Sequence, residues 1–199
     1  MSEWEPISGE TPIDISGLKA KGITNRRELS EAEASNISAA IFRYLVGPIT
    51  RRKAPFDVEW SLKLHQEMFG RVWKWAGEIR GGNLNLGVPV HQISQSLYLL
   101  FEDLAVWDVA WPDRVKQAVH LHYRAVAVHP FENGNGRWSR MLSNIWLRVN
   151  KHPIVEWPSD IGTTNPIRAE YLDCLRMADK GEIGPLAELH RRLLPNQED

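Results

Sequence analysis

The stretch His129-Pro-Phe-Glu-Asn-Gly-Asn-Gly-Arg137-Trp-Ser-Arg140 lies where one apolar helical run ends and another begins. Pro130 ends the first run, because proline lacks a backbone donor and restricts the residue before it. The Gly-Asn-Gly turn can form a concave nest of N–H groups, and the following helix points the positive end of its dipole at the same place. An imidazole and two arginines on one helix face complete the pattern. The stretch therefore predicts a polyphosphate site with a base beside it.

Apolar residues on both sides of this stretch recur at helical spacing, which predicts a mainly helical fold. Two overlapping helix-start patterns, Asn25-x-x-Glu28 and Ser30-x-x-Glu33, come before the first long helix. The predicted helices cover roughly 31–46, 58–73, 93–106, 111–128, the run from the Gly-Asn-Gly turn to Val149, a segment after Pro166, and a closing segment around 186–194.

Length and composition fit one helical domain. The 199 residues, 43% of them hydrophobic, can bury one good core but not two. The 24 Lys and Arg against 25 Asp and Glu exclude the overall basic field of a non-specific nucleic-acid binder. The single cysteine, the absence of a secretory signal and the absence of an apolar run near the ~18 residues of a membrane span point to the cytoplasm. We expect a cytoplasmic protein that binds neither nucleic acid nor membrane directly.

The segment Asn83-Leu-Asn-Leu-Gly-Val-Pro-Val90 alternates polar and apolar residues around a glycine. Alternation of this kind predicts a short β-hairpin, which must lie on the helical body because a lone hairpin is unstable. The hairpin is either a simple connector or a device with a function of its own.

The pattern His129-Pro-Phe-x-x-Gly-Asn-Gly-Arg137-x-x-Arg140 resembles the signature of Fic-domain proteins. The lead-in Trp75-Ala-Gly-Glu-Ile-Arg80 and the closing segments 171–175 and 181–186 are also similar to that family. The resemblance implies a Fic-type helical bundle with a short β-hairpin flap near the active site. It divides the chain into an N-terminal arm with an inhibitory helix region, residues 1–54, and a Fic domain, residues 55–199. Within the family, the chain resembles the bacterial branch labelled mobile mystery protein B.

The resemblance implies that the protein moves AMP from ATP to a protein. His129 is expected to be the general base that takes the proton of a Ser, Thr or Tyr hydroxyl. The target segment is expected to dock by strand addition on the hairpin at 82–90, which favours the functional interpretation of that hairpin.

The nucleotide is expected to lie on the Gly-Asn-Gly turn. By resemblance, Gly134, Asn135 and Gly136 cradle the phosphates of ATP, Arg137 holds the departing or bridging phosphates, and Arg140 holds the terminal phosphate. Positioning and charge stabilisation supply most of the catalysis expected for this kind of transfer.

Asn133 departs from the family pattern, which has Asp or Glu at this position to help hold Mg²⁺ on the phosphates. An amide oxygen can bind a hard cation but brings no negative charge, so Mg²⁺ would be held less firmly. Two hypotheses follow: a Fic-type adenylyltransferase using ATP and Mg²⁺, or a regulatory module that binds the nucleotide without transferring it.

Glu28 is the candidate regulatory residue. Thr24-x-x-x-Glu28 has the spacing of the family's inhibitory helix, whose glutamate pairs with the second motif arginine, here Arg140. The following Leu29 departs from the expected Gly or Asn. The alternative is that Glu28 completes the helix cap begun by Asn25. An antitoxin-like regulator is a further partner that this family relationship suggests.

Overall fold

The computed structural model describes residues 15–158 and 165–195 of the chain. In this part the protein is mainly helical, as predicted. In chain order the helices are η1 (Ile15–Gly17), α1 (Arg26–Leu45), α2 (Val58–Phe69), η2 (Val90–Gln92), α3 (Ile93–Ala110), α4 (Arg114–Val128), α5 (Asn135–Val149), α6 (Pro166–Ala178) and α7 (Gly184–Arg192).

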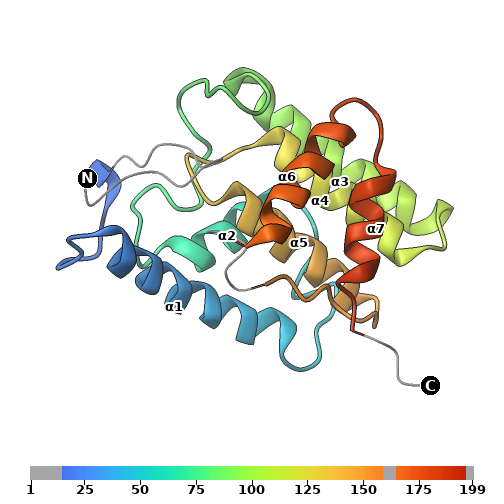
Figure 1. Ribbon diagram of the computed structural model, residues 1–199, viewed down its shortest axis with the longest axis horizontal. Helices are drawn as coiled ribbons and strands as arrows, with labels where there is room; N and C mark the ends of the chain where they lie inside the picture. Colours follow the sequence, from blue (N-terminus) through green and yellow to red (C-terminus); the bar gives the residue numbers. More distant parts are fainter. Residues whose placement is uncertain (1–14, 159–164, 196–199) are drawn as a thin grey trace.

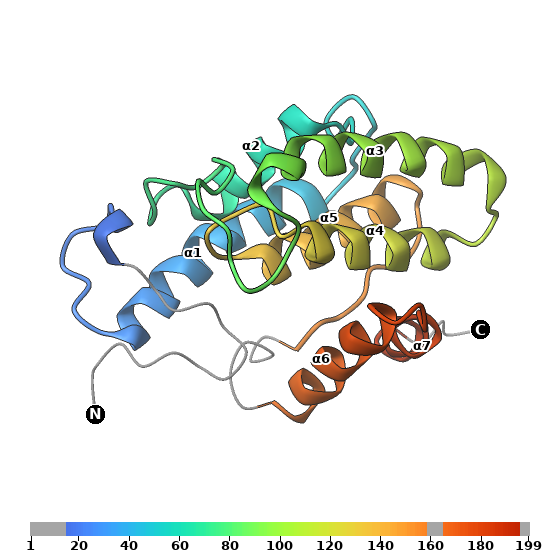
Figure 2. The same ribbon diagram turned by 90° about the horizontal axis from the view of Figure 1, so that it is seen from above.

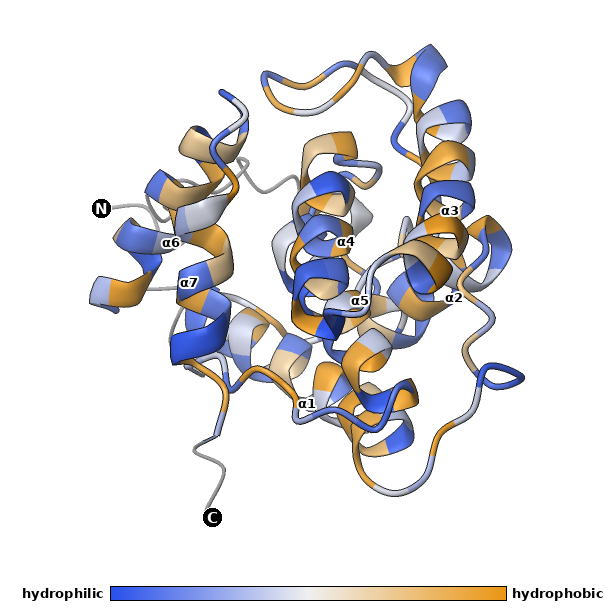
Figure 3. Cartoon of the chain, turned by 90° about the vertical axis from the view of Figure 1, so that its right-hand side faces the viewer, coloured by the Kyte–Doolittle hydropathy of each residue, from blue (hydrophilic) through white to orange (hydrophobic). Residues whose placement is uncertain are grey.

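Helices α4 and α5 form the centre of the molecule and are joined by the loop that carries the motif (Figures 1 and 2). Trp138, Leu142, Ile145 and Trp146 of α5 are fully buried, because they share one face of a 3.6-residue helix. Figure 3 shows α4 and α5 between α3 on one side and the α6–α7 pair on the other. The loop between α4 and α5 therefore receives neighbours from both ends of the chain.

Helix α1 packs on this body and is not a free arm. Leu29, Ala40 and Tyr44 are buried in the same core as α2 and α5. Tyr44 meets the ring of Trp60 of α2 edge-on, with ring centres 6.0 Å apart. The N-terminal helix can therefore reach the motif, which lies at the start of α5.

Three helices begin at an Asn or Asp cap residue, of which Asn25 lies in a predicted helix-start pattern. The side chains of Asn25, Asp57 and Asp113 each accept a hydrogen bond from the backbone N–H three residues later. The Asn25 cap begins α1 at Arg26, so the second predicted start at Ser30 is wrong: Ser30 lies within the helix. Because the earlier cap is satisfied, Glu33 is free to act elsewhere.

The predicted β-hairpin at 82–90 is wrong, because this segment is an irregular loop. The backbone of Val88 is bonded to Val128 and to the side chain of Arg80 instead of to a partner strand. The Asn83 side chain accepts from the N–H of Val90, at 2.8 Å. In residues 15–158 and 165–195, β structure is limited to one isolated bridge between Leu18 and Trp73. In this loop, bonds from Val128, Arg80 and Asn83 stand where the bonds of a strand ladder were expected.

None of the helices in the described part of the chain combines the length and the apolar character that crossing a bilayer requires.

Candidate active site between helices α4 and α5

His129 caps the C-terminus of α4 in a left-handed conformation, with φ 51° and ψ 60°. This conformation is uncommon for a residue other than glycine and turns the chain sharply out of the helix. Burial lowers the pKa of His129 from 6.5 to about 4; a backbone hydrogen bond at Val126 opposes this shift, and the charge of Arg80 adds to it. The imidazole is therefore neutral at pH 7 and able to accept a proton, although its pKa is lower than the near-neutral value expected for a general base.

Arg80 holds His129 and the loop at 82–90 together. Its guanidinium is almost fully buried and donates to the backbone carbonyls of His129 at 2.8 Å, of Gly82 at 2.6 Å and of Val88. A Cβ on Gly87 would lie 2.5 Å from the Cβ of His129, so only glycine allows this close approach. The loop at 82–90 is thus fixed directly against the candidate base.

Asn135 closes the motif loop by bonding to the backbone of Phe131 in both directions. Its Oδ1 accepts from the N–H of Phe131 at 2.9 Å, and its Nδ2 donates to the carbonyl of Phe131 at 2.8 Å. The Asn135 side chain is therefore occupied within the loop, and only its backbone can face a phosphate. Asn135 is also the first residue of α5, where backbone N–H groups have no partner within the helix.

His65 of α2 bonds to the backbone of the motif loop. Its Nδ1 accepts from Gly77 N–H at 3.0 Å, so its protonated Nε2 donates to the carbonyl of Asn133 at 3.1 Å. Burial lowers the pKa of His65 to about 3, in agreement with this neutral form. The ring stacks on Phe131 with centres 3.6 Å apart. A Cβ on Gly134 would meet Phe69 at 2.7 Å, and its φ of 81° also requires glycine.

Arg137 points from the first turn of α5 toward α1. Its Nη1 lies 2.5 Å from a carboxylate oxygen of Glu33, whose other oxygen accepts from the indole N–H of Trp73 at 2.6 Å. The guanidinium also lies over the ring of Phe69, 4.8 Å from its centre. About a third of the Arg137 side chain is exposed, so a phosphate can reach it, but Glu33 already occupies one side.

Arg140 lies one turn further along α5 and faces the C-terminal helices. Its Cζ is 5.4 Å from the ring centre of Tyr171 and 5.7 Å from that of Trp157. Burial lowers the pKa of Arg140, but an arginine remains charged in proteins. The Arg140 guanidinium lies close to the loop backbone, because a Cβ on Gly136 would be in van der Waals contact with Nη1 of Arg140, at 3.6 Å. The loop amides, Arg137 and Arg140 together form a local positive site in a chain of net charge −1.

Asn133 does not provide the centre of a protein-held magnesium site. Its amide oxygen accepts from the N–H of Gly134 at 2.5 Å, and its backbone carbonyl accepts from His65. The neighbouring Glu132 accepts from the N–H of Gly81 at 3.3 Å. The described residues contain no group of three His, Cys, Asp or Glu side chains able to hold a metal. These donors do not fit Mg²⁺, which prefers several oxygen ligands and carboxylates.

Glu28 does not lie beside Arg140 in this structure. Its carboxylate accepts from the backbone N–H and the hydroxyl of Thr24, at 2.7 and 3.0 Å, while its own N–H donates to Asn25. These bonds lower the pKa of the exposed Glu28 carboxyl. The interpretation of Glu28 as part of the Asn25 cap is the one that the contacts support. Glu33, more than one turn further on, is the α1 residue that reaches the motif.

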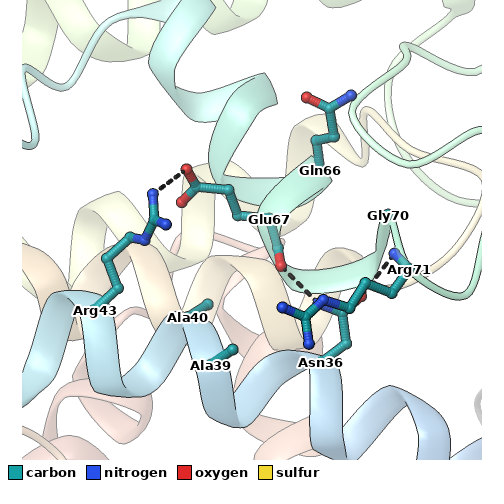
Figure 4. Close-up of a pocket in the computed structure, with 8 residues that line it drawn as sticks. All are labelled: Asn36, Ala39, Ala40, Arg43, Gln66, Glu67, Gly70 and Arg71. Atoms are coloured by element: carbon teal, nitrogen blue, oxygen red, sulfur yellow. Dashed lines mark hydrogen bonds and ion pairs between the residues drawn. The ribbon is translucent and has the colours of Figure 1, made fainter.

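The groove shown in Figure 4 lies between α1 and α2 and contains no motif residue. It is lined by residues such as Asn36, which bonds to the backbone of Glu67 and Arg71, and by the Arg43–Glu67 ion pair. These side chains are occupied by one another, so the groove is a packing feature between two helices and not part of the site.

Three supporting residues of this site were not identified as such from the sequence: Glu33, His65 and Arg80. The sequence contains a sign of the role of Glu33, because it lies on the same helix face as Leu29, Ile37 and Ala40, and a charged residue on an apolar face needs a partner. Arg80 had none, because an arginine in a loop is normally solvated. Its burial depends on backbone carbonyls that only the fold brings together.

The Fic/DOC family profile matches residues 55–147. A protein adenylyltransferase Fic from Drosophila erecta is 30% identical over 139 residues, which are 67% of this chain and 27% of that protein. The corresponding protein from Aedes aegypti is 27% identical over 182 residues, or 88% of this chain and 33% of the relative. This chain therefore spans about a third or less of the length of these curated relatives.

Solved Fic structures share the fold. BepC from Bartonella tribocorum, crystallised with bound AMPPNP, is 17% identical with a TM-score of 0.68, and each chain covers 97% of the other. Fic-1 (residues 134–508) from C. elegans is 24% identical with a TM-score of 0.64; the match covers 89% of this chain and 52% of that one. At these identities the likeness concerns the helical fold alone.

Proposed function

Because this chain belongs to the Fic/DOC family, we propose that it transfers AMP from ATP to a hydroxyl group of a protein, with His129 as the general base. The observation that carries the proposal is a neutral imidazole at the C-terminal cap of α4, six residues before the start of α5, whose first two turns carry Arg137 and Arg140. The curated relatives are named protein adenylyltransferase, which supports the same reaction.

His129 is suited to the base role by its protonation state and by its support. Burial and the charge of Arg80 lower the pKa of His129, so the ring is neutral at pH 7 and one of its nitrogens carries a lone pair that can accept a proton. Arg80 fixes the carbonyl of the same residue, which holds the imidazole in place. A general base must be neutral at the working pH and held within reach of the proton that it takes.

The proposed step is an in-line displacement at the α-phosphorus of ATP. The target hydroxyl oxygen forms a new bond to this phosphorus, and the bond from the phosphorus to the oxygen that bridges to the β-phosphate breaks. The hydroxyl proton passes to His129, and pyrophosphate leaves. The α5 amides and the guanidinium groups of Arg137 and Arg140 stabilise the phosphate charge, which is the main contribution expected from a protein in this chemistry.

The target protein is proposed to approach over the loop at 82–90. Leu86 is 58% exposed, and the backbone of residues 84–86 forms no hydrogen bond with the rest of the described chain. Open backbone donors and acceptors can pair with an extended segment, as in strand addition. Gly87 brings this loop directly against His129, so a hydroxyl on a segment docked here would reach the base.

AMP transfer can be tested with ATP labelled at the α-phosphate, using the purified protein alone and with added cell extract. His129→Ala should reduce incorporation of label by about 10²- to 10⁴-fold, the usual contribution of a general base. His91→Ala, at an exposed histidine outside the motif, is the matched control and should label like the native protein. Equal labelling by native protein and His129→Ala would rule out the proposed role of His129.

A second candidate function, nucleotide binding without transfer, is favoured by one observation. Asn133 replaces an acidic residue, and its amide oxygen already accepts from Gly134. Asn133→Asp restores a carboxylate and should raise Mg²⁺-dependent labelling severalfold if weak metal binding limits transfer. If neither native protein nor Asn133→Asp transfers label although both bind ATP, the regulatory module is the better description.

A further inference from the structure

Behind Arg140, three side chains form a buried hydrogen-bonded chain that the proposed reaction does not use. The Tyr171 hydroxyl of α6 lies 3.0 Å from Nε2 of His122 in α4. Nδ1 of the same histidine lies 3.0 Å from Nε2 of His190 in α7. Both histidine side chains are fully buried and Tyr171 is 4% exposed. We call Tyr171, His122 and His190 the buried relay.

The direction of each bond in the relay follows from its far end. Nδ1 of His190 lies 2.8 Å from the carbonyl of Leu186, which can only accept, so this nitrogen carries the proton. In the neutral ring, Nε2 of His190 must then accept, and His122 Nδ1–H donates to it. His122 Nε2 is therefore an acceptor, and the Tyr171 O–H donates to it. Burial lowers the pKa of His190 to about 4 and keeps both rings neutral at pH 7.

Because the Tyr171 hydroxyl donates its proton to His122, its oxygen can act only as an acceptor toward any other group. Arg140 lies close to Tyr171: its Cζ is 5.4 Å from the centre of the Tyr171 ring, and a Cβ on Gly136 would lie 3.6 Å from Arg140 Nη1 and 4.0 Å from the Tyr171 oxygen. Burial raises the pKa of Tyr171, and the nearby charge of Arg140 opposes that shift. Trp157 faces Arg140 as well and meets Tyr171 edge-on, at 5.6 Å between ring centres. Within the described residues, no carboxylate pairs with Arg140.

We propose that Tyr171, held by His122 and His190, is the positioning residue that aims Arg140 at the terminal phosphate of the nucleotide. The inference rests on the proposed function, because it assigns Arg140 a phosphate. It gives helices α6 and α7 a role in the active site: they hold the second motif arginine through a neutral acceptor that does not compete for its charge. Figure 2 shows this helix pair beside α4 and α5, on the side opposite α3.

Packing alone does not account for the relay. Three buried polar side chains cost free energy unless each is satisfied, and apolar residues of the same size would join α4, α6 and α7 at least as well. Here both nitrogens of each histidine and the Tyr171 hydroxyl have a partner, and the Tyr171 ring lies beside a motif arginine. A network satisfied throughout fixes one arrangement of its members.

The test combines ATP binding with a direct view of Arg140. Calorimetry measures the Kd of ATP for native protein, Tyr171→Phe, Arg140→Ala and the double variant. Tyr171→Phe should weaken binding about 5- to 10-fold, the scale of one ordinary polar interaction. The same change in the Arg140→Ala background should have less than about a 2-fold effect, because the hydroxyl then has no cation to aim. His190→Leu, which does not touch Arg140, should weaken binding in the same direction but less.

Tyr44→Phe is the matched control, since it removes a buried tyrosine hydroxyl on α1, and it should leave ATP binding unchanged. Thermal melts show which variants remain folded. An equal effect of Tyr171→Phe with and without Arg140, or no effect on native affinity, would overturn the proposal.

NMR provides a readout that does not depend on nucleotide binding. The Nε–H signal of Arg140 should be sharp in native protein and should shift and broaden in Tyr171→Phe. An unchanged Arg140 signal would contradict the relay even if ATP binds. If native protein does not bind ATP at all, the proposed function fails, and this signal still decides whether the relay holds Arg140.

Discussion

The two motif arginines stand three positions apart on α5, yet they are supported in opposite ways by opposite ends of the chain. Arg137 faces α1 and is paired with the carboxylate of Glu33 at 2.5 Å. Arg140 faces α6 and lies beside the rings of Tyr171 and Trp157, with no carboxylate partner among the described residues. The N-terminal side neutralises its arginine, whereas the C-terminal side orients its arginine and leaves the charge free.

This difference determines which arginine can bind a phosphate at once. A phosphate that binds Arg137 must displace the Glu33 carboxylate or share the guanidinium with it, because both anions accept hydrogen bonds from the same N–H groups. A phosphate that approaches Arg140 meets a cation already desolvated and bordered by neutral groups, where its attraction is stronger. We therefore expect Arg140 to contribute more to nucleotide binding and transfer than Arg137.

Removal of each arginine is the most direct test of this comparison. Arg140→Ala should reduce AMP transfer by about 10³-fold and Arg137→Ala by about 10²-fold, in the range for loss of a preorganised charged donor. The rates are measured with α-labelled ATP at a fixed protein concentration. Equal losses, or a greater loss for Arg137→Ala, would show that Glu33 does not reduce the contribution of Arg137.

Lowering the pH should destabilise the C-terminal side of the molecule through the buried His190. The pKa of His190 falls from 6.5 to about 4 on folding. Between pH 6.5 and pH 4, His190 is therefore protonated in the unfolded chain and neutral in the folded chain. The free energy of unfolding therefore decreases as the pH falls from about 6.5 to 4, by up to about 3 kcal/mol for this residue. Urea unfolding at several pH values measures the slope.

His190→Gln removes this titrating group, so the variant should be less stable at pH 7 but lose less stability on acidification than native protein. His91→Gln changes an exposed histidine and is the control. A native slope in His190→Gln would mean that other groups cause the acid sensitivity.

Neutralising Glu33 should give the smallest effect, and in the opposite direction. Glu33→Gln keeps an acceptor for the Trp73 indole but frees the charge of Arg137, so ATP affinity should increase about 5-fold, the scale of one partly exposed ion pair. Calorimetry with ATP measures this change. Glu31→Gln breaks only the exposed Arg27–Glu31 pair on the same helix and should leave affinity unchanged. Weaker binding in Glu33→Gln would show that Glu33 orients Arg137 and does not compete for it.

Most helices could be predicted from the sequence because their signals are local. Asn25, Asp57 and Asp113 bond to N–H groups three residues away, and apolar spacing reports which face is buried. The hairpin prediction failed at 82–90 because the bonds that shape this loop come from the Arg80 side chain, just outside the loop, and from the backbone of Val128, 40 positions after Val88. Alternation in sequence cannot reveal a competing side-chain donor.

The position of the candidate site was also predictable, since His129 to Arg140 is one continuous segment. The state of its residues was not. The low pKa of His129 arises from burial and from the charge of Arg80, and the role of the Asn135 side chain depends on its bonds to Phe131. Each of these properties requires the folded surroundings of the segment.

The sequence by itself thus determined the helices, the motif and the kind of ligand that the motif suits, because spacing, caps and charge are properties of neighbouring residues. Only the tertiary structure decided which partner each arginine meets. Glu33 lies 104 positions before Arg137, and Tyr171 lies 31 positions after Arg140. Contacts over such separations are set by how α1 and α6 pack on α5, and packing of this kind leaves no pattern in the local sequence.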